Sequence, residues 1–277
     1  MIIQGKIVKQ ISNDYTVKVN DEFIVCKARG KFRNLGITPL VGDNVEFENN
    51  YILNILPRKN ELVRPSISNV DQAVIVMSTH IPAFSTDLLD KLLCIIEYNN
   101  IKPIIYISKL DLLNDNEIDN INKYINYYKK IGYKVFTDIS IKEIFKDKIT
   151  VFVGQSGAGK STLLNNLDNS LNLKTGEVSI ALGRGRHTTR HVELINLLGG
   201  MIADTPGFSL ITFNDMSNND IRDNFIEFNN YREYCEYQDC MHKNEDNCEI
   251  KRQVINGNIL QSRYNNYLKF IENRVIK

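Results

Sequence analysis

Gly154-Gln155-Ser156-Gly157-Ala158-Gly159-Lys160-Ser161 matches the phosphate-binding loop pattern G-x-x-x-x-G-K-[ST] at every required position. Thr150–Val153 before it has the composition of a short buried strand, and Ser161–Leu167 after it continues as a helix. In such a unit, backbone N–H groups converge on phosphates at the helix N-terminus, the lysine adds positive charge, and the serine hydroxyl binds Mg²⁺. The alternative is a chance glycine-rich turn. We predict that this loop, continued to Thr162, binds a nucleoside triphosphate within an α/β fold.

Length and composition limit the remaining possibilities. The chain has 277 residues, which is enough for two or three domains. Its 34 basic and 33 acidic residues give a net charge of +1, so bulk charge does not indicate nucleic-acid binding. The sequence has no apolar run of membrane-spanning length and no signal-peptide core, so we expect a cytoplasmic protein without a membrane partner, and a monomer. An odd number of cysteines, five, favours a reducing compartment and a metal site over disulfides.

Residues 1–63 have the pattern of a small all-β domain. Five short runs with strand character predict a barrel of the oligonucleotide-binding (OB) type: Gln4–Ile11, Tyr15–Val19, Phe23–Ala28, Asn44–Phe47 and Tyr51–Leu56. If the third strand continues, basic residues at every second position share one face, with Phe32 on the other: Lys27, Arg29, Lys31 and Arg33. Such a basic ridge could follow an RNA backbone, and a solvated strand face is an equally simple interpretation.

Residues 64–212 alternate between strands and helices, which is the pattern of a mostly parallel α/β sheet. Buried strands are predicted at Ala73–Met77, Pro103–Ile107 and Tyr133–Thr137. Apolar residues at helical spacing mark two helices between these strands, and the second helix ends at Gly132: Leu88, Leu89, Leu92, Leu93, Ile95 and Ile96, then Ile118, Ile121, Ile125 and Tyr128. We interpret these stripes as core residues.

One short motif follows a predicted strand, at the edge where open α/β sheets bind ligands. Ser108-Lys109-Leu110-Asp111 resembles the N-K-x-D element with which GTPases read guanine. Asp111 can accept hydrogen bonds from N1–H and from the exocyclic amino group of guanine, and the stem of Lys109 can lie over the base. Ser140, after the next strand, could complete the base pocket. The alternative is a solvated Lys-x-Asp turn.

A second motif, Asp204-Thr205-Pro206-Gly207, follows the predicted strand Met201–Ala203 and has the form D-x-x-G. Asp204 would hold the Mg²⁺ shell together with Ser161, and the Gly207 amide would sense the γ-phosphate. The basic, glycine-rich stretch 183–189 before it is predicted to be a mobile switch that offers Thr189, or its neighbour Thr188, to the metal. Residues 191–198 and 201–203, joined by two glycines, predict a hairpin.

The C-terminal residues 213–277 contain a cysteine cluster, Cys235-x₄-Cys240-x-His242-x₅-Cys248. Four such ligands in a short span predict one closed, structural Zn²⁺ site of the Cys₃His type per chain, whereas the alternative is three unrelated thiols and a surface histidine. Cys26 and Cys94 are predicted to be packing residues. From residue 251 onward, basic residues interleave with aromatic ones, which fits either a second RNA contact or the polar face of a closing helix: Lys251, Arg252, Arg263, Lys269, Arg274 and Lys277, with Tyr264, Tyr267 and Phe270.

The order of the motifs is unusual, because the base-reading element precedes the phosphate loop and ordinary GTPases have the reverse order. The chain is therefore predicted to be circularly permuted. Along its whole length it resembles the circularly permuted, ribosome-dependent GTPases of small ribosomal subunit biogenesis, on the barrel, the cysteine cluster and three motifs: residues 69–72 (N-V-D-Q), 185–189 (G-R-H-T-T) and 204–208 (D-T-P-G-F). Ser108 departs from the usual asparagine, which removes an amide that would brace the pocket and leaves Asp111 as the main guanine reader.

This resemblance implies a P-loop GTPase domain between an OB barrel and a mainly helical zinc domain. It also implies a GTP hydrolase that binds the small ribosomal subunit and its rRNA late in maturation. Phe208 cannot orient the attacking water, and His187 matches the histidine to which this family's catalysis is attributed. An RNA-contacting or exposed imidazole is the alternative for His187. Two other functions stay open: an RNA-binding module with structural GDP and vestigial hydrolysis, and an ATPase.

Overall fold

The computed structural model describes residues 1–63, 66–173, 193–204 and 212–272. The chain forms two compact units that alternate along the sequence. The first unit comprises Met1–Val76 and Asp138–Leu210, and the second comprises Met77–Thr137 and Ile211–Lys277. The phosphate loop therefore belongs to the first unit, whereas the Ser108–Asp111 motif and the cysteine cluster belong to the second.

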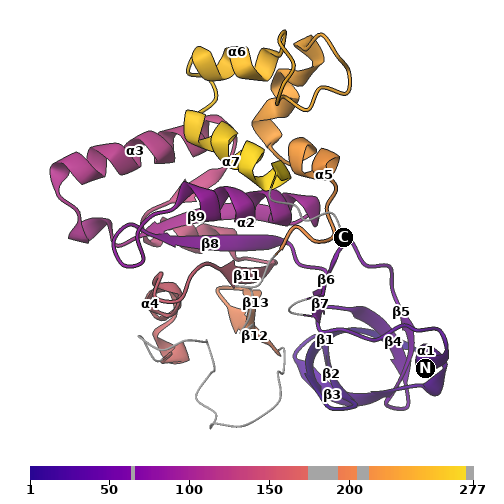
Figure 1. Cartoon of the computed structure of the whole chain (residues 1–277). Coiled ribbons are helices and arrows are strands. Elements are labelled where there is room, and N and C mark those ends of the chain that lie inside the picture. Colours follow the sequence, from indigo (N-terminus) through magenta and orange to yellow (C-terminus); the bar gives the residue numbers. More distant parts are fainter. Residues whose placement is uncertain (64–65, 174–192, 205–211, 273–277) are drawn as a thin grey trace. The chain divides into compact units, whose positions relative to one another are not determined.

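Five strands form a closed barrel in the first unit, drawn in indigo (Figure 1): β1 (Ile3–Ile11), β2 (Asp14–Val19), β3 (Glu22–Ala28), β4 (Asn44–Glu48) and β5 (Tyr51–Ile55). β1 pairs antiparallel with both β2 and β4, β2 pairs with β3, and β5 pairs with both β4 and β3, which closes the ring. Fully buried side chains such as Val17, Val45 and Ile52 fill the interior. The predicted OB-type barrel is confirmed.

The predicted continuation of the third strand as a basic ridge is wrong. β3 ends at Ala28, and the short helix α1 (Gly30–Asn34) follows. Phe32 is 5% exposed, so the helical turn places this ring in the core instead of on one face of a strand. Helical geometry does not put alternate residues on one side, so the four basic residues do not form one strand face: Lys27, Arg29, Lys31 and Arg33.

The hairpin of β6 (Glu61–Val63) and β7 (Ser66–Ser68) connects the barrel to β8 (Gln72–Ser78). β8 runs parallel to β11 (Ile149–Val153), and β11 runs parallel to β13 (Gly200–Asp204). β12 (Glu193–Leu197) pairs antiparallel with β13, which confirms the predicted hairpin, and it also pairs with β1. All residues of β11 are buried. Three shorter elements complete the first unit: η2 (Ile139–Ile144), α4 (Lys160–Leu167) and η3 (Asn169–Leu171).

The second unit contains the parallel strands β9 (Lys102–Ser108) and β10 (Lys134–Phe136). Two predicted helices are present, α2 (Thr86–Tyr98) and α3 (Asp115–Lys130), with η1 (Leu110–Leu112) between β9 and α3. The C-terminal part is mainly helical: α5 (Asn218–Asp223), η5 (Ile226–Asn230), η6 (Arg232–Tyr234), α6 (Glu249–Ile255) and α7 (Gln261–Glu272). α7 packs against α2 and α5 (Figure 1), and each of the three helices contributes buried side chains to one hydrophobic cluster.

Candidate nucleotide site and metal cluster

The phosphate loop has the backbone that its glycines permit. Gly154, Gly157 and Gly159 have φ of 136°, 77° and 97°, in a region that side chains with a Cβ rarely adopt. A Cβ on Gly154 would also lie 2.2 Å from the carbonyl oxygen of Val76. Buried Ala158 anchors the loop from beneath. The loop therefore keeps its path between β11 and α4 because three of its positions are glycine.

Lys160 begins α4 and turns back over the loop. Its Nζ donates to the carbonyl oxygens of Gly154 and Gln155, both at 2.7 Å. Burial lowers the pKa of Lys160 from its ordinary value. The ammonium thus lies at the helix N-terminus, where such loops bind the β and γ phosphates.

The rest of the loop and the end of a neighbouring strand lie in the same unit. Ser156 is exposed, and Ser161 and Thr162 belong to the first turn of α4, which Leu163 and Leu164 anchor in the core. β13 is parallel to β11 and ends at Asp204, so Asp204 and the loop follow the carboxyl ends of adjacent strands. Three further predicted site residues lie outside the described residues: His187, Thr189 and Gly207.

The base-reading motif lies in the second unit, at the end of β9. The Ser108 hydroxyl donates to the carbonyl oxygen of Met77 at 3.3 Å. Lys109 has a φ of 63°, its Nζ donates to the carbonyl oxygen of Ile81, and its own carbonyl oxygen accepts from the hydroxyl of Thr79 at 2.8 Å. A serine at position 108 therefore still braces the end of β9 against the end of β8, although it lacks an amide.

Asp111 and Ser140 both lie in short 3₁₀ helices and are exposed. Asp111 belongs to η1 of the second unit. Ser140 belongs to η2 of the first unit, and its backbone N–H donates to Oδ1 of Asp138 at 2.8 Å. The structure thus brings Ser140 together with the phosphate loop in one unit, and Asp111 together with Ser108 and Lys109 in the other.

The four predicted metal ligands converge in the second unit. One ligand atom from each of Cys235, Cys240, His242 and Cys248 lies within 4.8 Å of the other three. The Nδ1 atom of His242 lies 3.3 Å from Sγ of Cys248 and 3.7 Å from Sγ of Cys235. Ligands at about 2.0–2.3 Å from one ion fit inside such a span. The donor set therefore fits a tetrahedral metal ion, with Nδ1 of His242 as the nitrogen ligand.

Burial favours the neutral forms of His242, Cys240 and Cys248. It lowers the pKa of His242 to about 4, and it raises the pKa of Cys240 to about 12 and that of Cys248 above its ordinary value. A neutral imidazole is the form that binds a metal, whereas the thiols must lose their protons. Metal binding at this cluster would therefore release protons from the thiols.

Hydrogen bonds from two tyrosines of α7 hold the metal-ligand loop. The hydroxyl of Tyr267 donates to the carbonyl oxygen of Met241, and the hydroxyl of Tyr264 donates to that of His242, both at 2.6 Å. The carboxylate of Glu245 accepts from the backbone N–H groups of Met241 and Lys243, both at 2.7 Å. The two tyrosines are three residues apart on one helix, and this spacing lets both hydroxyls reach the loop that carries the ligands.

Comparison with known proteins gives the family. The model of the RsgA GTPase matches residues 55–214, and the model of the RsgA N-terminal domain matches residues 4–51. The small ribosomal subunit biogenesis GTPase RsgA 2 of Oceanobacillus iheyensis is 48% identical, over 97% of this chain and 96% of the relative. The RsgA protein of Enterococcus faecalis is also 48% identical, over 98% of this chain and 96% of its own. The chain belongs to the RsgA GTPase family.

Two solved structures have the same fold. YloQ, described as a circularly permuted GTPase, has a TM-score of 0.83 and 40% identity, with 98% of this chain and 94% of that chain covered. YjeQ from Thermotoga maritima has a TM-score of 0.86 and 33% identity, with 99% and 100% covered. The circular permutation predicted from the order of the motifs is confirmed, and so is the resemblance to circularly permuted GTPases of small ribosomal subunit biogenesis.

The interpretation of the basic residues in the C-terminal tail needs correction. The sequence left open an RNA contact or the polar face of a closing helix for these residues, and Arg263 fits neither because it is 1% exposed. The rings of that tail are also buried, at 0–9% exposure, so they cannot stack on RNA bases: Tyr264, Tyr267 and Phe270. The physical reason is that α7 closes the hydrophobic core of the second unit.

Cys26 and Cys94 are both fully buried, as predicted. No helix among the described residues is long and apolar enough to span a membrane.

Proposed function

We propose that this RsgA-family chain is a GTP hydrolase that acts with the small ribosomal subunit during maturation of that subunit. The observation that carries the proposal is the phosphate loop, in which three glycines with positive φ lead into Lys160. This loop follows β11, which pairs with β13, the strand that ends at Asp204. The relatives from O. iheyensis and E. faecalis are named as GTPases of small ribosomal subunit biogenesis, and each matches nearly the whole chain.

In the proposed site the first unit holds the phosphates. Backbone N–H groups of residues 154–161 and the ammonium of Lys160 contact the β and γ phosphates, and the Gly207 amide senses the γ-phosphate. Ser161, Thr189 and Asp204 would hold Mg²⁺, whose charge balances the charge that develops on the phosphates. What these residues contribute is position and charge, which is most of the catalysis in phosphoryl transfer.

Guanine is read by residues that follow β9. Asp111 is exposed on η1 and can accept hydrogen bonds from both N1–H and the exocyclic amino group of the base. Adenine presents no such pair of donors on that edge. The stem of Lys109 would lie over the base, Ser108 braces the turn by its bond to Met77, and Ser140 would close the pocket.

Water activation falls to His187 in this proposal, since the ring of Phe208 can neither donate nor accept the hydrogen bond that orients water. His187 would accept or orient that water when the small subunit is bound. His187→Ala should therefore retain GTP binding and lose most of the subunit-stimulated rate, whereas Lys160→Ala should lose nucleotide affinity itself.

The flanking regions would attach the enzyme to its partner. We propose three domains, 1–63, 64–212 and 213–277, of which the barrel contacts rRNA. The ion held by the Cys₃His cluster would be zinc, one per chain, and its chemistry there is structural because four protein ligands leave no open position. A monomer in the cytoplasm fits this role.

Nucleotide competition tests the base choice. GTP and GDP should bind at least about tenfold more tightly than ATP, because loss of a paired contact costs about 1.4 kcal/mol or more. Asp111→Asn should move the preference toward xanthosine nucleotides, since an amide can donate to the xanthine oxygen that a carboxylate repels. Asp115→Asn, which changes another exposed aspartate just after the motif, is the matched control and should keep guanine preference. Equal competition by ATP would contradict the GTPase proposal.

A further inference from the structure

A cavity of about 640 Å³ lies within the first unit. Three parts of the first unit line it. The barrel contributes Lys6 and Lys18, and the connection after the barrel contributes Lys59 and Asp71. The third part is the β12–β13 hairpin together with the loop before β11. The lining includes none of the described residues of the predicted nucleotide site. A volume of this size falls within the range of small-molecule sites, roughly 300–1,000 Å³.

The lining is strongly basic for its size. The described residues of the lining include four lysines, Lys6, Lys18, Lys59 and Lys148, and two aspartates, Asp71 and Asp147, which together carry a net charge of +2. Of the two acids, Asp71 is already occupied: one oxygen pairs with Lys59, and the other accepts from the backbone N–H of Ile149 at 2.7 Å. An anion that enters the cavity therefore meets a net positive charge, in which Lys59 is already paired with Asp71.

Two of these lysines are placed in an unfavourable way. Lys6 of β1 and Lys18 of β2 lie directly opposite each other in the antiparallel ladder. Like charges at such positions repel and destabilise the pair. Among residues 1–63, 66–173, 193–204 and 212–272, neither lysine forms an ion pair with a carboxylate. Burial lowers the pKa of Lys6, the nearby carboxylates of Asp71 and Asp43 raise it, and the charge of Lys59 lowers it.

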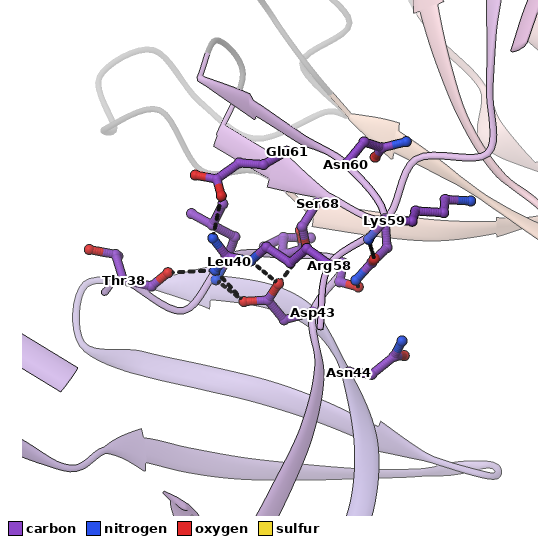
Figure 2. A network of polar contacts seen from close by, with 12 residues as sticks. Thr38, Leu40, Asp43, Asn44, Arg58, Lys59, Asn60, Glu61 and Ser68 are labelled. Atoms are coloured by element: carbon purple, nitrogen blue, oxygen red, sulfur yellow. Dashed lines mark hydrogen bonds and ion pairs between the residues drawn. The ribbon is translucent and has the colours of Figure 1, made fainter. Parts of the chain in front are cut away.

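Amide side chains hold these lysines toward the cavity. Nζ of Lys6 donates to Oδ1 of Asn44 at 2.8 Å, and Nζ of Lys18 lies 3.5 Å from Oδ1 of Asn196. Asn44 accepts this bond through its oxygen and itself lines the cavity. Figure 2 shows Asn44 and Lys59 extending away from the ion pair of Asp43. The donors around the cavity are therefore positioned by the protein.

The sheet side of the cavity is a close backbone contact. Gly199 has a φ of 74°, and a Cβ on Gly200 would lie 1.9 Å from the carbonyl oxygen of Phe145. The backbone N–H of Met201 donates to the carbonyl oxygen of Lys148 at 2.8 Å, and that of Asp147 donates to Gly199 at 3.0 Å. These contacts fix the β12–β13 turn against the loop before β11, so this wall is already formed.

We propose that this cavity is a second anion site, which binds a small phosphorylated ligand through Lys6, Lys18 and Lys59. Ammonium groups make strong, charge-assisted hydrogen bonds to phosphate oxygens, and bound phosphate removes the repulsion between Lys6 and Lys18. A small ligand suits the site better than an RNA strand, because Lys6 and Lys18, unlike the exposed Lys59, are half-buried in the wall of the cavity.

Calorimetric titration of the full chain with inorganic pyrophosphate tests the proposal. Saturating GDP occupies the phosphate loop, and Mg²⁺ is left out because it would bind the probe. One pyrophosphate should bind per chain, and Lys18→Gln should weaken its binding at least about fivefold. Lys27→Gln, which removes one exposed charge from the neighbouring strand β3 outside the cavity, is the matched control and should bind as the unchanged protein does. Lys6→Met should weaken binding more than Lys18→Gln, and retained GDP binding shows that each variant is folded.

Three results would overturn the proposal. The first is no pyrophosphate binding at saturating GDP. The second is equal weakening by Lys18→Gln and Lys27→Gln, which would indicate a general effect of net charge. The third is a short single-stranded RNA that loses affinity in the Lys6 and Lys18 variants and that pyrophosphate does not displace, since this would make the cavity part of an RNA surface.

Discussion

Arg58 and Arg263 have similar partners in different surroundings. Arg58, in the first unit, follows β5 and pairs with the buried Asp43 through two bonds of 2.7 Å, and with the half-exposed Glu61 (Figure 2). Its own side chain is 17% exposed. Arg263, in the second unit, is 1% exposed and pairs with Glu227 and Asp90, of which the side chains are 2% and 0% exposed. The network of Arg58 is partly accessible to solvent, whereas the network of Arg263 is buried.

This difference decides what each arginine contributes. Asp43 keeps other donors, the backbone N–H of Leu40 at 2.8 Å and the hydroxyl of Ser68 at 2.6 Å. Arg263 balances two carboxylates in the core, where burial raises the pKa of Asp90. Burial alone would lower the pKa of Arg263, and the carboxylates of Glu227 and Asp90 raise it well above its ordinary value. Asp90 and Glu227 also keep other donors: the hydroxyl of Tyr128 and the amide of Asn266 bond Asp90, and the hydroxyl of Tyr127 bonds Glu227. The two arginines therefore differ in burial and charge, because Arg263 balances two buried carboxylates and the partly exposed Arg58 balances one.

The two networks also join different parts of the RsgA chain. The first ties the turn before β4 of the barrel to the connection that leads to β8. The second ties α7 to α2 through Asp90 and to η5 through Glu227. One network thus anchors the barrel and the other anchors α7, so arginine–carboxylate pairs serve both units.

Loss of the metal ligand Cys240 should have the largest effect. Cys240→Ser should release the ion and destabilise the second unit by several kcal/mol, because binding energy at a structural metal site is folding energy. The measurements are metal content per chain and hydrogen exchange of the α7 amides, since Tyr264 and Tyr267 bond the ligand loop. Cys94→Ser changes another buried cysteine of the same unit and should keep the metal. A chain that was never exposed to chelator and carries no zinc would contradict the zinc proposal.

Arg263→Met should rank second, at about 3–5 kcal/mol, because it leaves two carboxylates buried without their cation. Hydrogen exchange of the slowest amides in α2 and α7 reports this loss within the second unit. Lys269→Ala removes an exposed pair with Asp87 from the same helix and should change stability by no more than about 0.5 kcal/mol. Equal effects of the two substitutions would show that burial does not decide the energies.

Arg58→Met should have the smallest effect of the three, about 1–3 kcal/mol, because Asp43 retains two donors and water reaches the site. Exchange of the β4 amides would measure the effect in the first unit. A loss as large as that of Arg263→Met would mean that the remaining donors do not compensate Asp43, and the comparison between the two networks would fail.

Local pattern was sufficient to predict much of this fold. Alternating strand character gave the five barrel strands, and the spacing of Gly154, Gly159 and Lys160 gave the phosphate loop with its strand and helix. The extension of β3 failed because periodicity alone could not show that Phe32 enters the core through a helical turn. The three-residue strands β6 and β7 are too short to leave a periodic signal.

Long-range pairing explains what the sequence concealed at the site. The bond between Arg263 and Asp90 joins residues 173 positions apart, so the sequence shows a basic residue in a basic tail and not its partner. The metal ligands were predictable because they lie within a span of 14 residues, from Cys235 to Cys248. The cavity at Lys6 could not be predicted from the sequence, because its lining residues come from segments that are distant in the sequence.

Steady-state GTP turnover, measured alone and with purified small ribosomal subunits, tests the proposed function most directly. The chain alone should turn over slowly, on the order of 10⁻³ s⁻¹ or below, as unassisted GTPases do. Saturating small subunits should raise the rate on the order of a hundredfold or more, if a partner completes the catalytic site as it does for other GTPases. A turnover rate that the subunits leave unchanged would contradict the account.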